Sequence, residues 1–272
     1  MLVSLNEALR CAVDGGYAIG SFNATSLESL QAIVGAAEKA GRAVILNFAE
    51  VHSPYVTMDE IGPIMLMYAK RASVPVCVHL DHGSSQEACM KAIRMGFTSV
   101  MLDASASPYE ENVALTAEIT RLAHSVGVSV EAELGCIGPA SDAYTDPDTA
   151  ADFVSRTGVD ALAIAFGTSH GVYAVRPVLD LDRISRIREK VSVPLVMHGG
   201  SGLSREEFQT AIRNGIRKVN YYTYMAIAGG TAVKAAMDRA QGNVFFHDIA
   251  VLGREAMTAD IYRAIQTFAL AD

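Results

Sequence analysis

Three histidines, each followed by a glycine, are the residues of this 272-residue sequence whose type and spacing most clearly suggest chemistry. They are His82, His170 and His198, and each lies at the end of a short apolar run or just after it. Three imidazole ligands that leave a fourth position open are the usual arrangement around a catalytic Zn²⁺. A lone histidine at a strand end is more often a hydrogen-bonded capping group. Three histidines that end strands at the same edge of a sheet favour a metal site.

Carboxylates accompany these histidines. Asp81 precedes the first of them, Asp103 ends the next apolar run, and Glu131 and Glu133 alternate along another. Carbonyl chemistry that moves protons needs a positioned carboxylate. Strand alternation would point neighbouring side chains to opposite faces, so Asp81 can share a site with the residue after it only if the strand ends there.

Glycine-rich turns supply a candidate anion site. Gly171 follows His170, and Gly199, Gly200 and Gly202 surround Ser201. The segment 220–223 adds a third turn near the last apolar run. Backbone N–H groups in such turns, at the starts of helices, can bind phosphate. A Gly-Gly-Ser-Gly run alone can be only a tight turn, and its place beside a histidine favours the phosphate site.

Eight short apolar runs alternate with helical patterns and must position these residues. The runs lie at 17–23, 43–48, 76–81, 99–103, 128–134, 161–166, 195–198 and 218–222. Their near-continuous apolar character is typical of parallel strands buried on both faces. They recur about every 28 residues, close to the length of one βα repeat.

Eight such repeats predict a TIM (β/α)8 barrel, in which the chemistry lies at the carboxyl ends of the strands. An open doubly wound sheet is the alternative, but no G-x-G-x-x-G motif follows the first run. Helix starts are indicated at Ser26, Ser85 and Ser204, the last forming a capping box with Glu207. The segment 242–272 exceeds what eight repeats need, so we expect extra C-terminal helices within one domain spanning 1–272.

The barrel brings further polar residues to the same rim. The first strand ends in Asn23, and the last contains Asn220 before Thr223. We expect His79 to be a packed strand residue. The remaining histidines, His52, His124 and His247, are expected in loops or on the surface.

Charge and composition exclude several functions. Thirty acidic against 22 basic residues give a net charge of −8, which argues against binding to nucleic acid or an anionic membrane. No stretch approaches the length and apolarity of a membrane span. The 4 cysteines show no paired spacing, which is typical of a reduced cytoplasmic protein.

The motifs that hold these residues resemble those of the class II, metal-dependent fructose-bisphosphate and tagatose-bisphosphate aldolase family. They occur in family order as HLDHGSS at 79–85, SVMLDAS at 99–105, EEN at 110–112, VEAELG at 130–135, AFGTSHGVY at 165–173, PLVMHGGSGL at 194–203 and KVN at 218–220. Any one of these motifs alone is unspecific, but the ordered set is very specific.

The resemblance implies a role for each residue. The residues that would bind the catalytic zinc are His82, His170 and His198. Asp81 would be the base that moves the substrate proton. Asp103 and Glu133 would form an alternative metal position or support the ligands. The positions that match the phosphate site of dihydroxyacetone phosphate are Gly171, Gly199, Ser201 and Thr223, and Asn220 would lie near the reacting end of the substrate.

Elementary chemistry agrees with this interpretation. Cleavage of a C–C bond beside a carbonyl needs an electron sink, either a lysine Schiff base or a Lewis-acid metal. No lysine lies at the carboxyl end of a predicted strand, and Lys218 lies at the start of the last one. We therefore expect a zinc-dependent aldolase that cleaves a ketose phosphate or bisphosphate to dihydroxyacetone phosphate and an aldehyde through a metal-stabilised enediolate. A sugar phosphate substrate, a homodimer or homotetramer, and room for a monovalent cation near the phosphate complete the expectation.

The sequence departs from the family pattern around the substrate. The run after the fifth strand lacks the family's mobile-loop glutamate, for which Asp142 or Tyr144 are candidate replacements. Tyr222 stands where an aspartate is usual, and Glu50 follows the second strand, where a carboxylate would repel a second phosphate. These changes suggest a substrate other than fructose 1,6-bisphosphate. The alternatives are the same chemistry on an unphosphorylated or otherwise modified ketose, or a non-catalytic paralogue or partner subunit.

Overall fold

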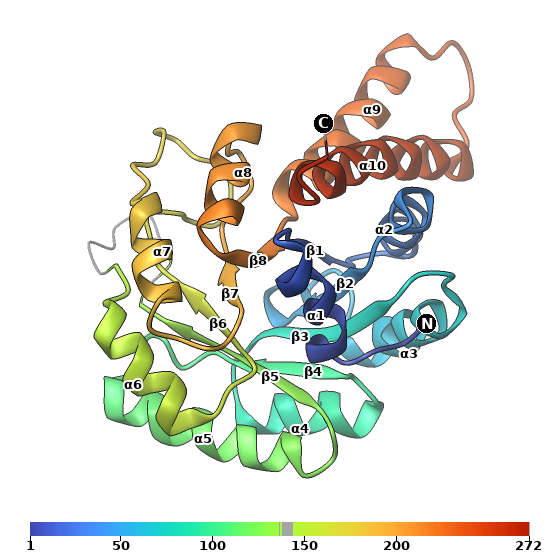
Figure 1. Cartoon of the computed structure of the whole chain (residues 1–272). Coiled ribbons are helices and arrows are strands. Elements are labelled where there is room, and N and C mark those ends of the chain that lie inside the picture. Colours follow the sequence, from blue (N-terminus) through green and yellow to red (C-terminus); the bar gives the residue numbers. More distant parts are fainter. Residues whose placement is uncertain (136, 138–143, 272) are drawn as a thin grey trace.

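The computed structural model describes residues 1–135, 137 and 144–271. In this part of the chain eight parallel strands follow one another around a closed barrel, and the last strand pairs with the first. Figure 1 shows this ring and the helices outside it. The strands are β1 (Ile19–Asn23), β2 (Val44–Ala49), β3 (Val76–Gly83), β4 (Ser99–Leu102), β5 (Ser129–Leu134), β6 (Ala161–Ile164), β7 (Leu195–Met197) and β8 (Ile216–Asn220). The predicted TIM barrel is confirmed, with small differences at strand ends.

Helices follow the strands, and the predicted start signals are confirmed. The helices are α1 (Leu5–Gly15), α2 (Leu27–Ala40), the short 3-10 helix η1 (Glu50–His52), α3 (Met58–Arg71), α4 (Gln86–Met95), α5 (Tyr109–His124), α6 (Pro147–Thr157), α7 (Leu181–Arg188), α8 (Arg205–Asn214), α9 (Thr223–Arg239) and α10 (Phe246–Phe268). Ser26 and Ser85 cap α2 and α4 through their side chains. Ser204 and Glu207 form the expected capping box of α8.

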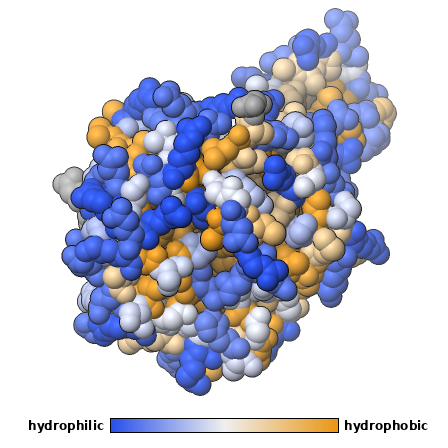
Figure 2. All heavy atoms as spheres, viewed as in Figure 1, coloured by the Kyte–Doolittle hydropathy of each residue, from blue (hydrophilic) through white to orange (hydrophobic). Residues whose placement is uncertain are grey.

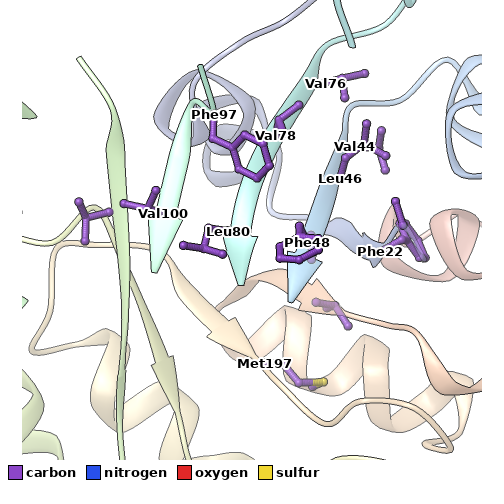
Figure 3. Close-up of a cluster of buried hydrophobic side chains, with 14 of the residues drawn as sticks. Phe22, Val44, Leu46, Phe48, Val76, Val78, Leu80, Phe97, Val100 and Met197 are labelled. Atoms are coloured by element: carbon purple, nitrogen blue, oxygen red, sulfur yellow. The ribbon is translucent and has the colours of Figure 1, made fainter. Parts of the chain in front are cut away.

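Alternation along the strands divides the core into two parts. Val44, Leu46 and Phe48 of β2 point outward, beside Val78 and Leu80 of β3, and pack under the helices (Figure 3). The intervening inward residues form a second cluster with the apolar side of α1. That cluster includes Leu5, Leu9, Ile45, Cys77 and Val196. Because α1 covers one end of the barrel, the opposite end remains for a site.

The two C-terminal helices have different places in the fold. Helix α10 packs against α2 and also contacts α8 and β1, so it occupies the position of the eighth barrel helix. Helix α9 packs mainly on α10, and together they project from the barrel (Figure 1). The extra helical structure is thus confirmed, but its expected place in the segment 242–272 was wrong. That segment holds α10, which closes the ring, and the additional helix is α9, which precedes it.

None of the described helices is long and apolar enough to cross a membrane. Among the described cysteines, Cys11, Cys77 and Cys89 are free. That residues 1–272 form one domain stays a prediction.

Candidate active site

Asp81 and His82 line the same pocket although they are neighbours on one strand. The pairing of β3 with β4 shifts its register between Leu80 and Gly83, and His82 adopts a left-handed φ of 47°. Such an irregularity re-aims a side chain that regular alternation would point away. A Cβ on Gly83 would lie 2.6 Å from the carbonyl oxygen of Met101, so this turn requires glycine. The local distortion is what brings the two side chains together.

The three histidines meet above the carboxyl ends of the strands. Their ring nitrogens come within 4.8 Å of one another. Nδ1 of His198 lies 2.9 Å from Nε2 of His82, and the ring centroids of His82 and His170 are 5.1 Å apart. Three imidazoles therefore point nitrogens at one small volume, as the sequence predicted.

Carboxylates hold the outer nitrogens of two of these rings. Nδ1 of His82 is 2.6 Å from Asp103, and Nε2 of His198 is 2.8 Å from Glu131. A ring that donates its outer N–H to a carboxylate directs the lone pair of its other nitrogen inward, as histidine ligands of metals do. For His170, desolvation of the ring by the surrounding groups and the neighbouring His198 lower the pKa to about 4, so the ring is neutral near pH 7. The donor set fits a Zn²⁺ ion.

Glu133 supplies a further observation that fits a cation. Its side chain is buried, and its Oε2 atom has no hydrogen-bond partner among the described residues. That oxygen lies 3.5 Å from Nδ1 of His198, and burial raises the pKa of Glu133 to about 6. Glu133 also forms a second possible cluster of ligands with His82 and Asp103. A cation at this place would satisfy an otherwise unpaired buried carboxylate.

A buried polar network lies directly beneath the histidines. Nζ of Lys218 is 2.8 Å from Oε2 of Glu131 and donates to Oδ1 of Asn220 at 2.8 Å. The amide of Asn220 donates in turn to Oδ1 of Asp81 at 2.9 Å. Burial alone would raise the pKa of the Asp81 carboxyl, but the nearby positive charges outweigh it and hold that pKa well below its usual range. Asp81 is therefore an ionised, oriented carboxylate.

The sequence-based placement of two residues in this network was wrong. Glu131 was expected on the rim with the other carboxylates, but it is fully buried below the pocket. Lys218 was expected at the start of the last strand, but it lies in the middle of β8, where it is fully buried and faces Glu131. Burial would raise the pKa of Glu131, but the Lys218 ammonium and the hydrogen bond from His198 lower it to about 2.

These residues surround a cavity of about 500 Å³. Its lining includes all predicted site residues except the buried His198, namely Asn23, Asp81, His82, Asp103, Glu133, His170, Gly171, Gly199, Ser201, Asn220 and Thr223. The sequence analysis missed His52, which it placed in a loop or on the surface and which also lines the cavity. The signal was available, because His52 follows β2 at the carboxyl end where a barrel places its site.

One wall of the cavity is built from turns after β6, β7 and β8. Gly199 has a φ of 64°, and a Cβ there would lie 2.5 Å from the carbonyl carbon of Ser169. The backbone N–H of Tyr222 points to Oγ of Ser201 at 3.4 Å, and α9 begins at Thr223. Glycine turns and a helix start on one wall expose N–H groups that suit an anion.

Two candidate residues from the sequence do not line the cavity. The carboxylate of Glu50 accepts the backbone N–H of Ser84 at 2.5 Å, so the expectation that it faces the distal part of the pocket was wrong. Tyr144 donates its hydroxyl to the carbonyl of Val178 instead. Asp142 lies outside the described residues.

Comparison with known proteins agrees with the fold. Residues 3–272 match the family model described as fructose-bisphosphate aldolase class-II. The chain is 41% identical to a fructose-bisphosphate aldolase of Geobacillus stearothermophilus, over 98% of this chain and 96% of that protein. It is 44% identical to a probable fructose-bisphosphate aldolase of Bacillus subtilis, over 87% and 86% of the two chains.

A solved structure gives the same result. The crystal structure of the YdjI aldolase from Escherichia coli K12 matches with a TM-score of 0.90 and 38% identity, over 98% of this chain and 97% of that one. Barrel, site and relatives together define the protein as an aldolase, a lyase that breaks or forms a C–C bond. The chain belongs to the class II fructose-bisphosphate aldolase family.

Proposed function

We propose that the protein is a zinc-dependent aldolase that reversibly cleaves a ketose phosphate or bisphosphate to dihydroxyacetone phosphate and an aldehyde. The observation that carries this proposal is the set of three converging imidazoles beside an ionised, amide-oriented Asp81. A metal site supplies the electron sink that the reaction needs, and the neighbouring carboxylate can move the proton.

The zinc would be held by Nε2 of His82, Nδ1 of His198 and a ring nitrogen of His170. When bound, Zn²⁺ acts as a Lewis acid that polarises the substrate carbonyl. Asp103 and Glu133 would hold the outer side of this site or offer an alternative position for the ion, since both lie against His82 in one cluster.

Asp81 would act as the catalytic base. In the cleavage direction its carboxylate accepts the hydroxyl proton from the carbon that becomes the aldehyde. The C–C bond then breaks, and its electron pair stays with the dihydroxyacetone phosphate half, which later takes up a proton at the same carbon. The amide of Asn220, held by Lys218, keeps the carboxylate in place for this transfer.

The phosphate would bind at the wall formed by Gly171, Gly199, Ser201 and Thr223. Backbone N–H groups of the glycine turns and of the first turn of α9 would hold its oxygens. Asn23, at the end of β1, would offer its amide to substrate hydroxyl groups. A monovalent cation near the phosphate stays a prediction.

Proton exchange tests the proposed function without knowledge of the aldehyde. The protein is mixed with dihydroxyacetone phosphate in heavy water, and loss of the hydroxymethyl proton signal is followed with zinc, and with a chelator. We expect zinc-dependent exchange that the chelator abolishes. Absence of exchange by the zinc-loaded protein would contradict the proposal and would favour a non-catalytic paralogue or an unphosphorylated donor.

We also propose that the protein forms a homodimer or homotetramer. The pair of projecting helices carries exposed apolar side chains, visible in the upper right of Figure 2. Phe245 and Phe246 at the start of α10 are 57% and 78% exposed, and Ile227, Val251 and Leu252 are also exposed. Apolar side chains gathered on a protruding element are typical of an interface between subunits. A cytoplasmic location stays a prediction.

A further inference from the structure

We propose that the half of the cavity that receives the aldehyde is built for an uncharged hydroxyaldehyde, so that the substrate is a ketose with one phosphate group. This inference rests on the proposed function and specifies its substrate. The surface in question comprises Asn23, Ala49, Val51, His52 and Tyr222, which we call the distal wall. These residues specify what the second half of the substrate can be.

The distal wall lies across the barrel from most of the phosphate wall. Asn23, Ala49, Val51 and His52 follow β1 and β2, whereas Gly171 and Gly199 follow β6 and β7. In a closed ring of eight strands, β2 and β6 are opposite one another. A ketose phosphate anchored by its phosphate near Gly171 would therefore extend past the three histidines toward the distal wall.

The charges around the cavity disfavour a second phosphate there. The described lining residues include three carboxylates, of Asp81, Asp103 and Glu133, and neither lysine nor arginine. In the printed sequence, residues 136 and 138–143 also contain no lysine or arginine. Proteins usually hold phosphates with Arg or Lys, or with backbone N–H groups at a helix start. Among the described residues, the wall formed by the glycine turns and the start of α9 is already assigned to the first phosphate.

The distal wall offers groups that suit hydroxyls and C–H surfaces instead. The ring of His52 lies 4.5 Å from the ring of Tyr222, centroid to centroid, with an angle of 50° between them. Nδ1 of His52 is buried and has no hydrogen-bond partner among the described residues. Burial lowers the pKa of His52, so the ring is neutral and can pair with a hydroxyl group.

Tyr222 connects the two walls. Its backbone N–H contacts Ser201 on the phosphate wall, while its ring packs against His52 on the distal wall. Aromatic rings present large apolar faces with a polar edge, which match the C–H faces and hydroxyls of a sugar chain. Val51 extends this apolar surface and is 75% exposed. The distal wall is thus polar enough to orient a hydroxyaldehyde but carries no positive charge.

The condensation reaction tests this inference with the full-length protein in its natural oligomeric state. The zinc-loaded protein is given dihydroxyacetone phosphate with either glyceraldehyde or glyceraldehyde 3-phosphate, and kcat/KM is measured for each aldehyde. We expect the value for glyceraldehyde to exceed the other by about tenfold or more. A ratio of kcat/KM for glyceraldehyde to kcat/KM for glyceraldehyde 3-phosphate above one supports the inference. A ratio of one or below overturns it. If a second copy of this chain supplied a positive charge to the distal wall, the measured ratio would be one or below.

Matched variants locate the preference in the distal wall. Val51→Arg places a positive charge there, and we expect it to raise the relative kcat/KM for glyceraldehyde 3-phosphate. Val126→Arg is the control, because Val126 is also an exposed valine, at 62% against 75% for Val51, but lies between α5 and β5 and does not line the cavity. If the ratio of the kcat/KM values for the two aldehydes is the same in the two variants, the preference does not arise from the distal wall. His52→Phe keeps the ring and removes Nδ1, so KM for glyceraldehyde should rise about tenfold, the loss of one good hydrogen bond.

Proton exchange separates failure of this inference from failure of the proposed function. If the zinc-loaded protein exchanges the dihydroxyacetone phosphate proton but prefers glyceraldehyde 3-phosphate, the aldolase chemistry stands and the single-phosphate substrate is wrong. If exchange itself is absent, the proposed function fails first. Exchange by Val51→Arg also shows that this variant is folded and loaded with metal.

Discussion

Replacing Lys218 with methionine would leave the buried carboxylate of Glu131 without the ammonium group that now faces it. The two groups are 2.8 Å apart, and both side chains are fully inaccessible to solvent. Breaking a buried ion pair by removing one partner costs about 3–5 kcal/mol, because the remaining charge stays buried. At about 2–4 °C per kcal/mol for a chain of this size, the melting temperature should fall by roughly 6–20 °C.

The same substitution should weaken metal binding. Glu131 accepts from Nε2 of His198, so its charge and position set the orientation of a proposed zinc ligand. Loss of such outer contacts typically lowers metal affinity by about 10–100-fold. Urea unfolding gives the free-energy change, and zinc competition with a chromogenic chelator gives the affinity. A second readout is kcat, which should fall because Asn220 loses the contact that orients it toward Asp81.

Two variants control this prediction. Lys218→Met combined with Glu131→Gln removes both charges, so it should recover most of the lost stability. Lys91→Met breaks an ion pair with Asp59 whose partners are 43% and 65% exposed, and such surface pairs contribute at most about 1 kcal/mol. The reasoning is refuted if Lys218→Met is no more costly than Lys91→Met, or if the double variant is as unstable as the single one.

Three further predictions follow from the site and the core. Asp81→Asn should slow ketose cleavage at least a hundredfold, as expected for loss of a catalytic base, while zinc content measured by mass spectrometry stays unchanged. Burial lowers the pKa of His79 to about 3 from an ordinary 6.5, so the unfolded chain binds an extra proton between these values and stability falls as pH drops through this window. His79→Gln should remove about 1.4 kcal/mol per pH unit of that slope in urea titrations between pH 6 and 4, and an unchanged slope would contradict the assignment. Gly83→Ala should cost about 1–3 kcal/mol because of the Met101 carbonyl, whereas Gly35→Ala, with open space around it, should be neutral or stabilising by the same urea assay.

Much of the fold could be predicted from the sequence because local signals agreed with each other. Near-continuous apolar runs indicated buried parallel strands, and serine caps such as Ser26 and Ser204 marked helix starts. Regular spacing then indicated the barrel, and the barrel placed the polar strand ends on one rim. The positions of His82, His170 and Asp103 around one cavity follow from that topology alone.

Contacts that depend on three-dimensional packing could not be predicted in this way. Period-two alternation could not show that β3 shifts its register at Leu80, which turns His82 toward Asp81. Nor could it show that the side chain of Lys218 reaches Glu131, a residue 87 positions away. Whether Glu50 faces the cavity or the N–H of Ser84 was decided by the turn after β2.

The packing of α10 against the first part of the barrel has a consequence for synthesis. Arg254 on α10 donates to Gln31 on α2, 223 residues earlier, and Phe268 accepts the N–H of Ala18 just before β1. A ribosome that adds about 5–20 residues per second takes roughly 10–45 s to make that stretch. During that time the surface of β1 and α2 that α10 later covers stays exposed on the nascent chain. The strand that is made first is therefore among the last to be completed.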